Sequence, residues 1–414
     1  MRSVGLTADG FILFGTRVAR MFAYGFLSVV LALYLSELGF SEAAIGMVLS
    51  LTLIGDALIS LIMTTTADRV GRRRMLVIGA GLMLFAGTLF AFTRSPPLLL
   101  VAAIIGVISP SGYEVGPFLA VEQAALSHAV PDRERTRVFA WYNLVGSFAT
   151  ALGALAGGGL SGILQKAGVM PLNSYRVILL GYAAIGVLLA SLFVRLSSAI
   201  EVSRPDGSAT FQSRFGLHRS RGVVMKLCSL FGLDAFAGGF VIQSIVAYWF
   251  HLRFGVDPAT LGGIFFGANI LAGISALAAA WVAARIGLVN TMVFTHLPSN
   301  ILLLLVPLMP NLPLAIAALL LRFSISQMDV PARQSYTMAV VASDERSAAA
   351  GVTGITRTIG ASLSPALAGL FISNPALLGA PFFVAGGLKV IYDVLLYRSF
   401  RALKAPEEHP VRKS

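Results

Sequence analysis

Residues 42–93 read EAAIGMVLSLTLIGDALISLIMTTTADRVGRRRMLVIGAGLMLFAGTLFAFT, two long apolar runs on either side of the charged segment ADRVGRRR at 67–74. Each run is longer than the roughly 18 predominantly apolar residues that separate a membrane-spanning helix from a buried helix of a water-soluble protein. The stretch therefore predicts two consecutive transmembrane helices joined by a short basic loop.

The same alternation of apolar runs and charged connectors continues over the whole chain of 414 residues. The composition is 57% hydrophobic and 12% charged, whereas a soluble domain carries about 25% charged residues. The first run continues past Leu35 without a small-residue cleavage site, so we interpret it as a helix and not as a signal peptide. We predict an all-α membrane protein with twelve transmembrane helices, in which helices 1, 4, 7 and 10 cover Phe11–Leu38, Pro97–Ala125, Gly222–Phe250 and Pro313–Val341.

The net charge of +12 is concentrated in short connectors on one side of the predicted helices. This distribution is typical of the positive-inside rule and needs no polyanionic partner, so we expect contact with a lipid bilayer and no nucleic-acid binding. It places both termini in the cytoplasm, and we expect a bacterial inner (plasma) membrane.

A polar stretch in the middle divides the chain. We predict a six-helix bundle over 1–196, a cytoplasmic linker over 197–221, a second six-helix bundle over 222–400 and a cytoplasmic tail over 401–414. The halves repeat weakly: placing Gly39 on Gly255 also brings Gly71 onto Gly287. Such matches at corresponding helix ends favour two parallel repeats.

The loop segment at 67–74 resembles the pattern Gly-x-Leu-Ala-Asp-Arg-x-Gly-Arg-Arg of the major facilitator superfamily, between its helices 2 and 3. The matching residues are Asp68, Arg69, Gly71, Arg72 and Arg73. The chain departs from the pattern at Thr64 and Thr66, which replace the glycine and the leucine. The resemblance implies the two-bundle fold of that family and transport by alternating access.

The same loop suggests a cytoplasmic latch between the halves. Gly71 allows a tight turn, and Asp68 could face the positive N-terminus of helix 11. The arginines could bridge to Glu122 at the cytoplasmic end of helix 4. The alternative is that these arginines only satisfy the positive-inside rule.

Predicted helix 5 contains Gly153, Gly157 and Gly158 in a segment that resembles the Gly-Pro-x-x-Gly-Gly motif of drug/proton antiporters. Ala154 stands where that motif has proline, and the matched place in helix 11 keeps Pro365. Small residues let helices approach closely, and proline allows a bend. Ordinary helix packing is the alternative, and the arginine that this class carries in helix 4 is missing.

Ionisable residues inside membrane spans are costly and indicate function or pairing. In the resembled family, helices 1, 4, 7 and 10 line the central cavity, so the resemblance implies a proton or substrate cavity with these residues: Asp234, Glu114, Asp329, Arg322, Arg17 and Arg20. Asp234 and Arg322 lie at similar predicted depths, roughly 17 Å from the cytoplasmic helix ends. An acid that exchanges its arginine partner for substrate could take and release a proton in each cycle. The alternative is permanent pairing that only fixes the packing.

Three further residue pairs receive structural interpretations. Asp56 and Arg357 could meet as an ion pair where helices 2 and 11 adjoin in the resembled family. Lys389 and Asp393 are i,i+4 neighbours on one helix. Met292 and His296 could touch a soft metal, but we interpret them as core residues.

The sequence contains no phosphate-binding Gly-x-x-x-x-Gly-Lys-Ser/Thr segment and no catalytic constellation, so we expect no ATP-driven pump, no enzyme, no cofactor and no metal. The preferred function is proton-coupled efflux of a small, partly apolar compound by a monomer. Uptake of an anionic or zwitterionic metabolite, with Arg17 and Arg20 holding the anion, is the first alternative. A non-transporting membrane sensor or scaffold is the second.

Overall fold

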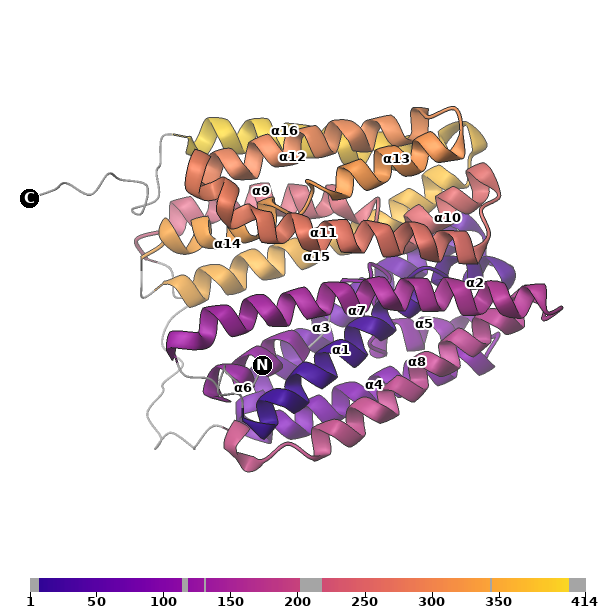
Figure 1. Ribbon diagram of the computed structural model, residues 1–414, viewed down its shortest axis with the longest axis horizontal. Coiled ribbons are helices and arrows are strands. Elements are labelled where there is room, and N and C mark those ends of the chain that lie inside the picture. The colour runs from indigo at the N-terminus through magenta and orange to yellow at the C-terminus, as the bar shows by residue number, and fades with distance from the viewer. Residues whose placement is uncertain (1–6, 114–117, 130–131, 202–217, 343–344, 402–414) are drawn as a thin grey trace, which may run out of the picture. The chain divides into compact units, whose positions relative to one another are not determined.

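The computed structural model describes residues 7–113, 118–129, 132–201, 218–342 and 345–401. In this part of the chain every regular element is a helix, which confirms the predicted fold class (Figure 1). Nine helices of the described residues are long and apolar enough to cross a membrane, and the bent pair α1 and α2 adds a tenth. Two further predicted spans are present as shorter broken helices.

Of the described residues, the first compact unit holds those between 7 and 201 and Ile242–Gly267. Its helices are α1 (Ala8–Ser28), α2 (Leu31–Glu37), α3 (Glu42–Val70), α4 (Arg72–Phe92), α5 (Pro96–Ile105), α6 (Phe118–Ala129), α7 (Asp132–Lys166), α8 (Pro171–Val194) and α10 (Gln243–Phe254), together with the start of α11 (Pro258–Ile286). The second unit holds the described residues of 218–241 and 268–401. Its helices are α9 (Arg221–Gly239), the rest of α11, α12 (Leu288–Leu305), α13 (Leu312–Phe323), α14 (Asp329–Ala339), α15 (Arg346–Ile372) and α16 (Ala380–Phe400).

This grouping differs from the predicted boundary at residue 222, because α10 and the start of α11 pack within the first unit. The Ser244 hydroxyl donates to the carbonyl oxygens of Ser28 and Pro110, at 2.6 and 2.8 Å. Gln243 Nε2 donates to Ser28 Oγ at 2.8 Å. Polar contacts between residues far apart in the sequence therefore tie α10 to the N-terminal helices.

The predicted continuous helices 1, 4, 7 and 10 are each broken. Helix 1 is bent by 41° between α1 and α2. Helix 4 ends at Ile105 and resumes at Phe118, and its break contains Pro110, which lacks an N–H, and Gly112, with a φ of +71°. Helix 7 is interrupted between α9 and α10, and helix 10 between α13 and α14. Hydropathy does not reveal the breaks in helices 1 and 7, because the parts on both sides are apolar. In helix 10 the second part, α14, is rich in polar residues.

Glycines at matching places in the two halves adopt the same unusual backbone conformation. Gly39 and Gly255 have φ values of +87° and +65°, and Gly71 and Gly287 have +109° and +87°. L side chains are strained in this region, so glycine is favoured there. These local similarities support the weak internal repeat.

The second unit has an apolar core. It includes Leu227 and Phe231 of α9, Met292 of α12, Tyr336 of α14 and Leu396 of α16. Since α9, α12, α14 and α16 all contribute to it, this core fixes the helices that carry the cluster described next.

Candidate functional site

A cluster of charged side chains in the second unit centres on Asp234 of α9. Its Oδ1 accepts from Lys389 Nζ of α16 at 2.5 Å. Its Oδ2 accepts from the Nη1 atoms of Arg333 on α14 and Arg357 on α15, each at 3.1 Å. Asp234, Arg333 and Lys389 are buried, whereas the Arg357 side chain is 33% exposed. One carboxylate therefore bonds three cations, and one of these reaches the surface of its unit.

Asp329 extends the cluster along α14. Its Oδ2 accepts from Arg333 Nη1 at 3.1 Å across one helical turn. Arg333 thus bridges two buried carboxylates, as suits a guanidinium with several donors in a fixed fork. Ionic groups taken out of water require such partners, because an unpaired buried charge is strongly destabilising.

Arg322 does not pair with Asp234, although the sequence predicts similar depths for the two residues. It stands near the end of α13 with its guanidinium 5.0 Å from the Phe323 ring. The prediction assumed one continuous helix 10. The break between α13 and α14 interrupts the helical repeat, so the partner comes from α14 instead.

His296 and Asp393 lie beside Asp234 and were missed as site residues. His296 Nδ1 is 2.8 Å from Asp393 Oδ1, and its Nε2 is 3.8 Å from Asp234 Oδ1. Asn300 Nδ2 donates to Asp393 Oδ2 at 2.8 Å. A signal was present in the sequence, since His296 with Asn300, and Lys389 with Asp393, are i,i+4 pairs that share a helix face.

A second buried ion pair lies in the first unit. Arg20 of α1 and Glu122 of α6 form a bidentate pair, with distances of 2.6 and 2.8 Å, and both side chains are completely buried. Thr16 Oγ1 donates to the same carboxylate at 2.9 Å, and so does the Tyr142 hydroxyl. Arg17 lies over the Tyr142 ring, with its Cζ 4.7 Å from the ring centroid.

The described contacts of Glu122 run to Arg20, Thr16 and Tyr142. They do not include Arg72 or Arg73, for which the latch hypothesis offered Glu122 as the candidate partner. The described contacts of Arg72 and Arg73 run to the residues after α8. Their backbone N–H groups donate to Glu201 Oε2 and Oε1 at 2.7 and 3.2 Å. Their guanidinium groups donate to the carbonyl oxygens of Ile200 and Leu196, each at 3.2 Å. A glutamate at a helix N-terminus satisfies free N–H groups, so this contact caps α4.

Two other parts of the prediction cannot be located in the structure. Glu114, expected in the cavity, lies outside the described residues, as do the side chains of Asp68 and Arg69. Asp68 and Arg69 themselves fall in the last turn of α3, before Gly71. The latch therefore stays a prediction for these two residues.

Asp56 and Arg357 have different surroundings from the predicted ion pair. Arg357 bonds Asp234 within the second unit. Asp56 of α3 belongs to the first unit and is completely buried, and neither of its oxygens has a hydrogen-bond partner among the described residues. Asp56 is thus a buried carboxyl without an ion-pair partner in the described structure.

The glycines of α7 lie at close helix contacts. A Cβ atom on Gly153 or Gly157 would lie 2.0 or 2.1 Å from the backbone oxygens of Phe22 and Phe26 in α1. A Cβ on Gly158 would lie 2.2 Å from the Pro258 oxygen at the start of α11. Pro365 lies inside α15, and the neighbouring Ser364 hydroxyl donates to the Phe236 carbonyl of α9. These positions suit close helix packing and do not by themselves indicate an antiporter.

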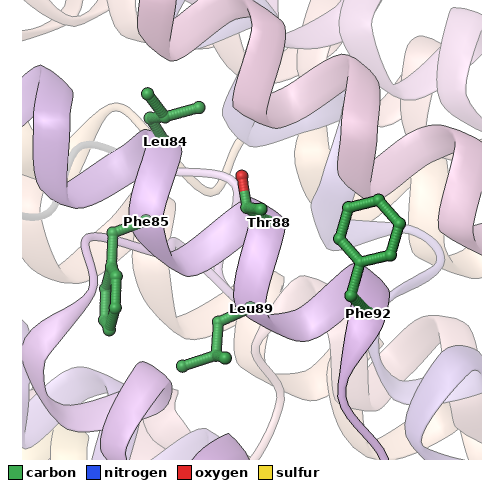
Figure 2. Close-up of a pocket in the computed structure, with 5 residues that line it drawn as sticks. All are labelled: Leu84, Phe85, Thr88, Leu89 and Phe92. Atoms are coloured by element: carbon green, nitrogen blue, oxygen red, sulfur yellow. The ribbon is translucent and has the colours of Figure 1, made fainter.

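The shallow pocket in Figure 2 is distinct from both charged clusters. Its five lining residues all come from the C-terminal half of α4: Leu84, Phe85, Thr88, Leu89 and Phe92. The hydroxyl of Thr88 is the only side-chain polar atom among these five. Phe92 is 72% exposed. An exposed apolar helix face of this kind suits contact with lipid chains.

The comparisons with known proteins agree on the fold. The model of the Major Facilitator Superfamily matches residues 13–365. An uncharacterised membrane protein of Saccharomyces cerevisiae is 31% identical over 95% of this chain and 94% of its own length. A Na⁺, Li⁺, K⁺/H⁺ antiporter of Planococcus maritimus is 30% identical over 44% of this chain and 41% of its own length. The crystal structure of a mutant of the nucleoside transporter NupG superposes with a TM-score of 0.74 at 14% identity, over 95% of this chain and all of the other.

Proposed function

The chain belongs to the Major Facilitator Superfamily, and we propose that it carries a small solute by alternating access in a cycle coupled to protons. Membership makes the protein a multi-pass membrane transporter and not an enzyme. It also favours transport over a non-transporting sensor or scaffold.

The proposal of proton coupling rests on the partners of Asp234. A carboxylate that bonds Lys389, Arg333 and Arg357 is stable as an anion, and adding a proton would leave these three cations in excess. An anionic or polar group of a solute could then take the place of the carboxylate on the arginine side, where Arg357 is partly exposed. One acid would thus link the proton to the solute.

For direction, we propose export of a small, partly apolar compound. Support comes from the small-residue motif of α7, which resembles that of drug/proton antiporters. The partial match to a protein named as a cation/proton antiporter points the same way. Uptake of an anionic or zwitterionic metabolite is the second candidate, and the paired guanidinium groups of Arg333 and Arg357 favour it.

We further propose that both termini and residues 197–221 face the cytoplasm, because the connectors on that side carry most of the lysines and arginines. The relative that matches nearly the whole chain comes from yeast, so a bacterial inner membrane stays a prediction, as does the monomer. Labelling of intact cells with a membrane-impermeant maleimide tests the orientation. Lys166→Cys should be labelled and Ser414→Cys should not, in a chain whose native Cys228 is replaced by serine.

The test of the function begins with a screen for compounds that raise the melting temperature of the purified protein. A compound that binds is then offered to proteoliposomes that contain a pH-sensitive dye. Export coupled to protons predicts that solute added to one side moves protons to that side. Asp234→Asn should abolish the proton signal, whereas Glu37→Gln, at an exposed acid, should retain it. Wild-type proton flux in Asp234→Asn would contradict the proposal.

Whole cells separate the two candidate directions. When the proton gradient is collapsed, export predicts more of the compound inside the cells, and uptake predicts less.

A further inference from the structure

His296 of α12 lies between two buried carboxylates from different helices. Its Nδ1 is 2.8 Å from Asp393 Oδ1 on α16, and its Nε2 is 3.8 Å from Asp234 Oδ1 on α9. The residue is 4% exposed. Imidazole is the side chain that most readily changes charge near neutral pH, and both of its nitrogens here face an acid.

The Asp393 side of the ring is fixed. Asp393 is completely buried, and Asn300 Nδ2 donates to its second oxygen at 2.8 Å and lies 3.1 Å from His296 Nδ1. The Tyr392 ring packs edge-on against the imidazole, with ring centroids 5.8 Å apart. A carboxylate on one ring nitrogen sets the tautomer by accepting its proton. When Asp393 accepts the hydrogen of Nδ1, Nε2 is the ring nitrogen that is left to face Asp234.

The two oxygens of Asp234 have different surroundings. Oδ2 bonds the two arginines, and Oδ1 bonds Lys389 at 2.5 Å while also facing His296 Nε2. The charged and titratable groups in contact with the ring are Asp234 of α9 and Tyr392 and Asp393 of α16. The cations bonded to Asp234 are Arg333 of α14, Arg357 of α15 and Lys389 of α16. With His296 neutral, the carboxylates of Asp234, Asp329 and Asp393 balance the three cations.

We propose that His296 shares the coupling proton with Asp234, and that its protonated form competes with Lys389 for Asp234 Oδ1. A proton from water adds to the Nε2 lone pair, and no bond between heavy atoms changes. The imidazolium then donates from both nitrogens, to Asp393 and toward Asp234. Asp393 is a positioning residue, because it acts through the imidazole.

This inference deepens the proposed function and rests on it for its biological meaning. It assigns the proton to the Oδ1 side of Asp234 and leaves the Oδ2 side, with Arg333 and Arg357, for the solute. Groups this close titrate together, so the proton is shared by the His296–Asp234 pair during the transport cycle. The binding of the proton to Nε2 is nevertheless a property of the isolated protein and can be measured without any solute.

The test is ¹⁵N NMR of the full-length protein in detergent micelles, labelled at its five histidines. The His296 signals are identified by their loss in His296→Gln. They are identified independently in a variant that replaces His128, His218, His251 and His409 by glutamine and leaves the cluster intact. At high pH the shifts should show hydrogen on Nδ1 and none on Nε2. The proposal predicts that hydrogen appears on Nε2 as the pH is lowered across the measured range.

Two controls sharpen the result. His251→Gln removes an imidazole of the first unit that contacts the Val256 carbonyl, and it should leave the His296 signals unchanged. Asp393→Asn should reduce protonation of Nε2 over the same pH range, because the amide no longer balances the imidazolium. Hydrogen on Nε2 at every pH, with Asp393 carrying the second proton, would overturn the proposal, as would an Nε2 that never protonates. Loss of proton flux with a normal His296 titration would contradict the proposed function instead.

Discussion

Arg20 and Glu122 form a bidentate ion pair of 2.6 and 2.8 Å in the first unit, and both side chains have no exposed surface. They lie on α1 and α6, far apart in the sequence. The pair is complete in itself because Thr16 and Tyr142 donate to the same carboxylate. The second unit differs, since its central carboxylate has three cationic partners and one of them is partly exposed.

The first prediction concerns this pair. Glu122→Gln leaves a buried guanidinium without its anion, which costs about 3–5 kcal/mol of unfolding free energy. The double variant Arg20→Met/Glu122→Leu should recover most of this loss, because no charge is left unpaired. Reversible unfolding in mixed micelles measures both variants. Equal losses in the single and double variants would show that shape and not charge matters at this site.

The second prediction contrasts Asp56 with Asp234. A carboxylate ion without a partner in an apolar interior is very costly, so we expect Asp56 to carry a proton. Asp56→Asn should then change the unfolding free energy by less than about 1 kcal/mol, since one neutral polar group replaces another. Asp234→Asn should cost much more, because three cations lose their anion. A large loss in Asp56→Asn would indicate an ionised carboxylate with a partner.

The third prediction follows from Glu345, which lies before the first turn of α15. Burial alone raises its pKa, but the backbone N–H groups of His218, Arg219 and Ser220 donate to the carboxylate and lower the pKa to about 2. The unfolded value is 4.5. Because the folded pKa is depressed, the stabilisation is complete above pH 4.5 and is lost as the pH falls toward about 2.

The melting temperature, followed by tryptophan fluorescence, tests this dependence. Glu345→Gln should melt below the wild type by a constant margin above about pH 5, and the margin should shrink toward about pH 2. Glu37→Gln, at an exposed acid, should melt like the wild type throughout. A margin that does not depend on pH would mean that the carboxylate charge does not contribute to this cap.

The fourth prediction tests the glycine contacts of α7. Gly157→Val would bring a Cβ atom to 2.1 Å from the Phe26 carbonyl oxygen, so α1 and α7 must separate. Overpacking of this kind costs about 1–3 kcal/mol or more. Gly159→Val is the matched control, because nothing lies within 4 Å of the added Cβ on the same helix. Size-exclusion profiles and melting temperatures should separate the two variants, and equal behaviour would exclude a packing role for Gly157.

Several features could be read from the sequence because each depends on local composition. Apolar length predicts the spans, and the positive φ of Gly71 is expected for a glycine in a tight loop. The cost of charge in a membrane also draws attention to Asp234 and Asp329 from the sequence alone. The partners of Asp234 could not be predicted in the same way, because Lys389 and Arg357 lie on other helices. Depth along the helix pointed to Arg322 instead.

The sequence by itself predicted a membrane transporter with twelve spans that resembles the Major Facilitator Superfamily, and it drew attention to the ionisable residues of the predicted spans. Only the tertiary structure decided the partners: Arg20 for Glu122, and Lys389, Arg333 and Arg357 for Asp234, with His296 and Asp393 beside them. The depth of a residue follows from counting along its helix. Its partner depends on the rotation of each helix, on its neighbours and on the breaks in helices 4, 7 and 10, which are set by packing between residues distant in the chain.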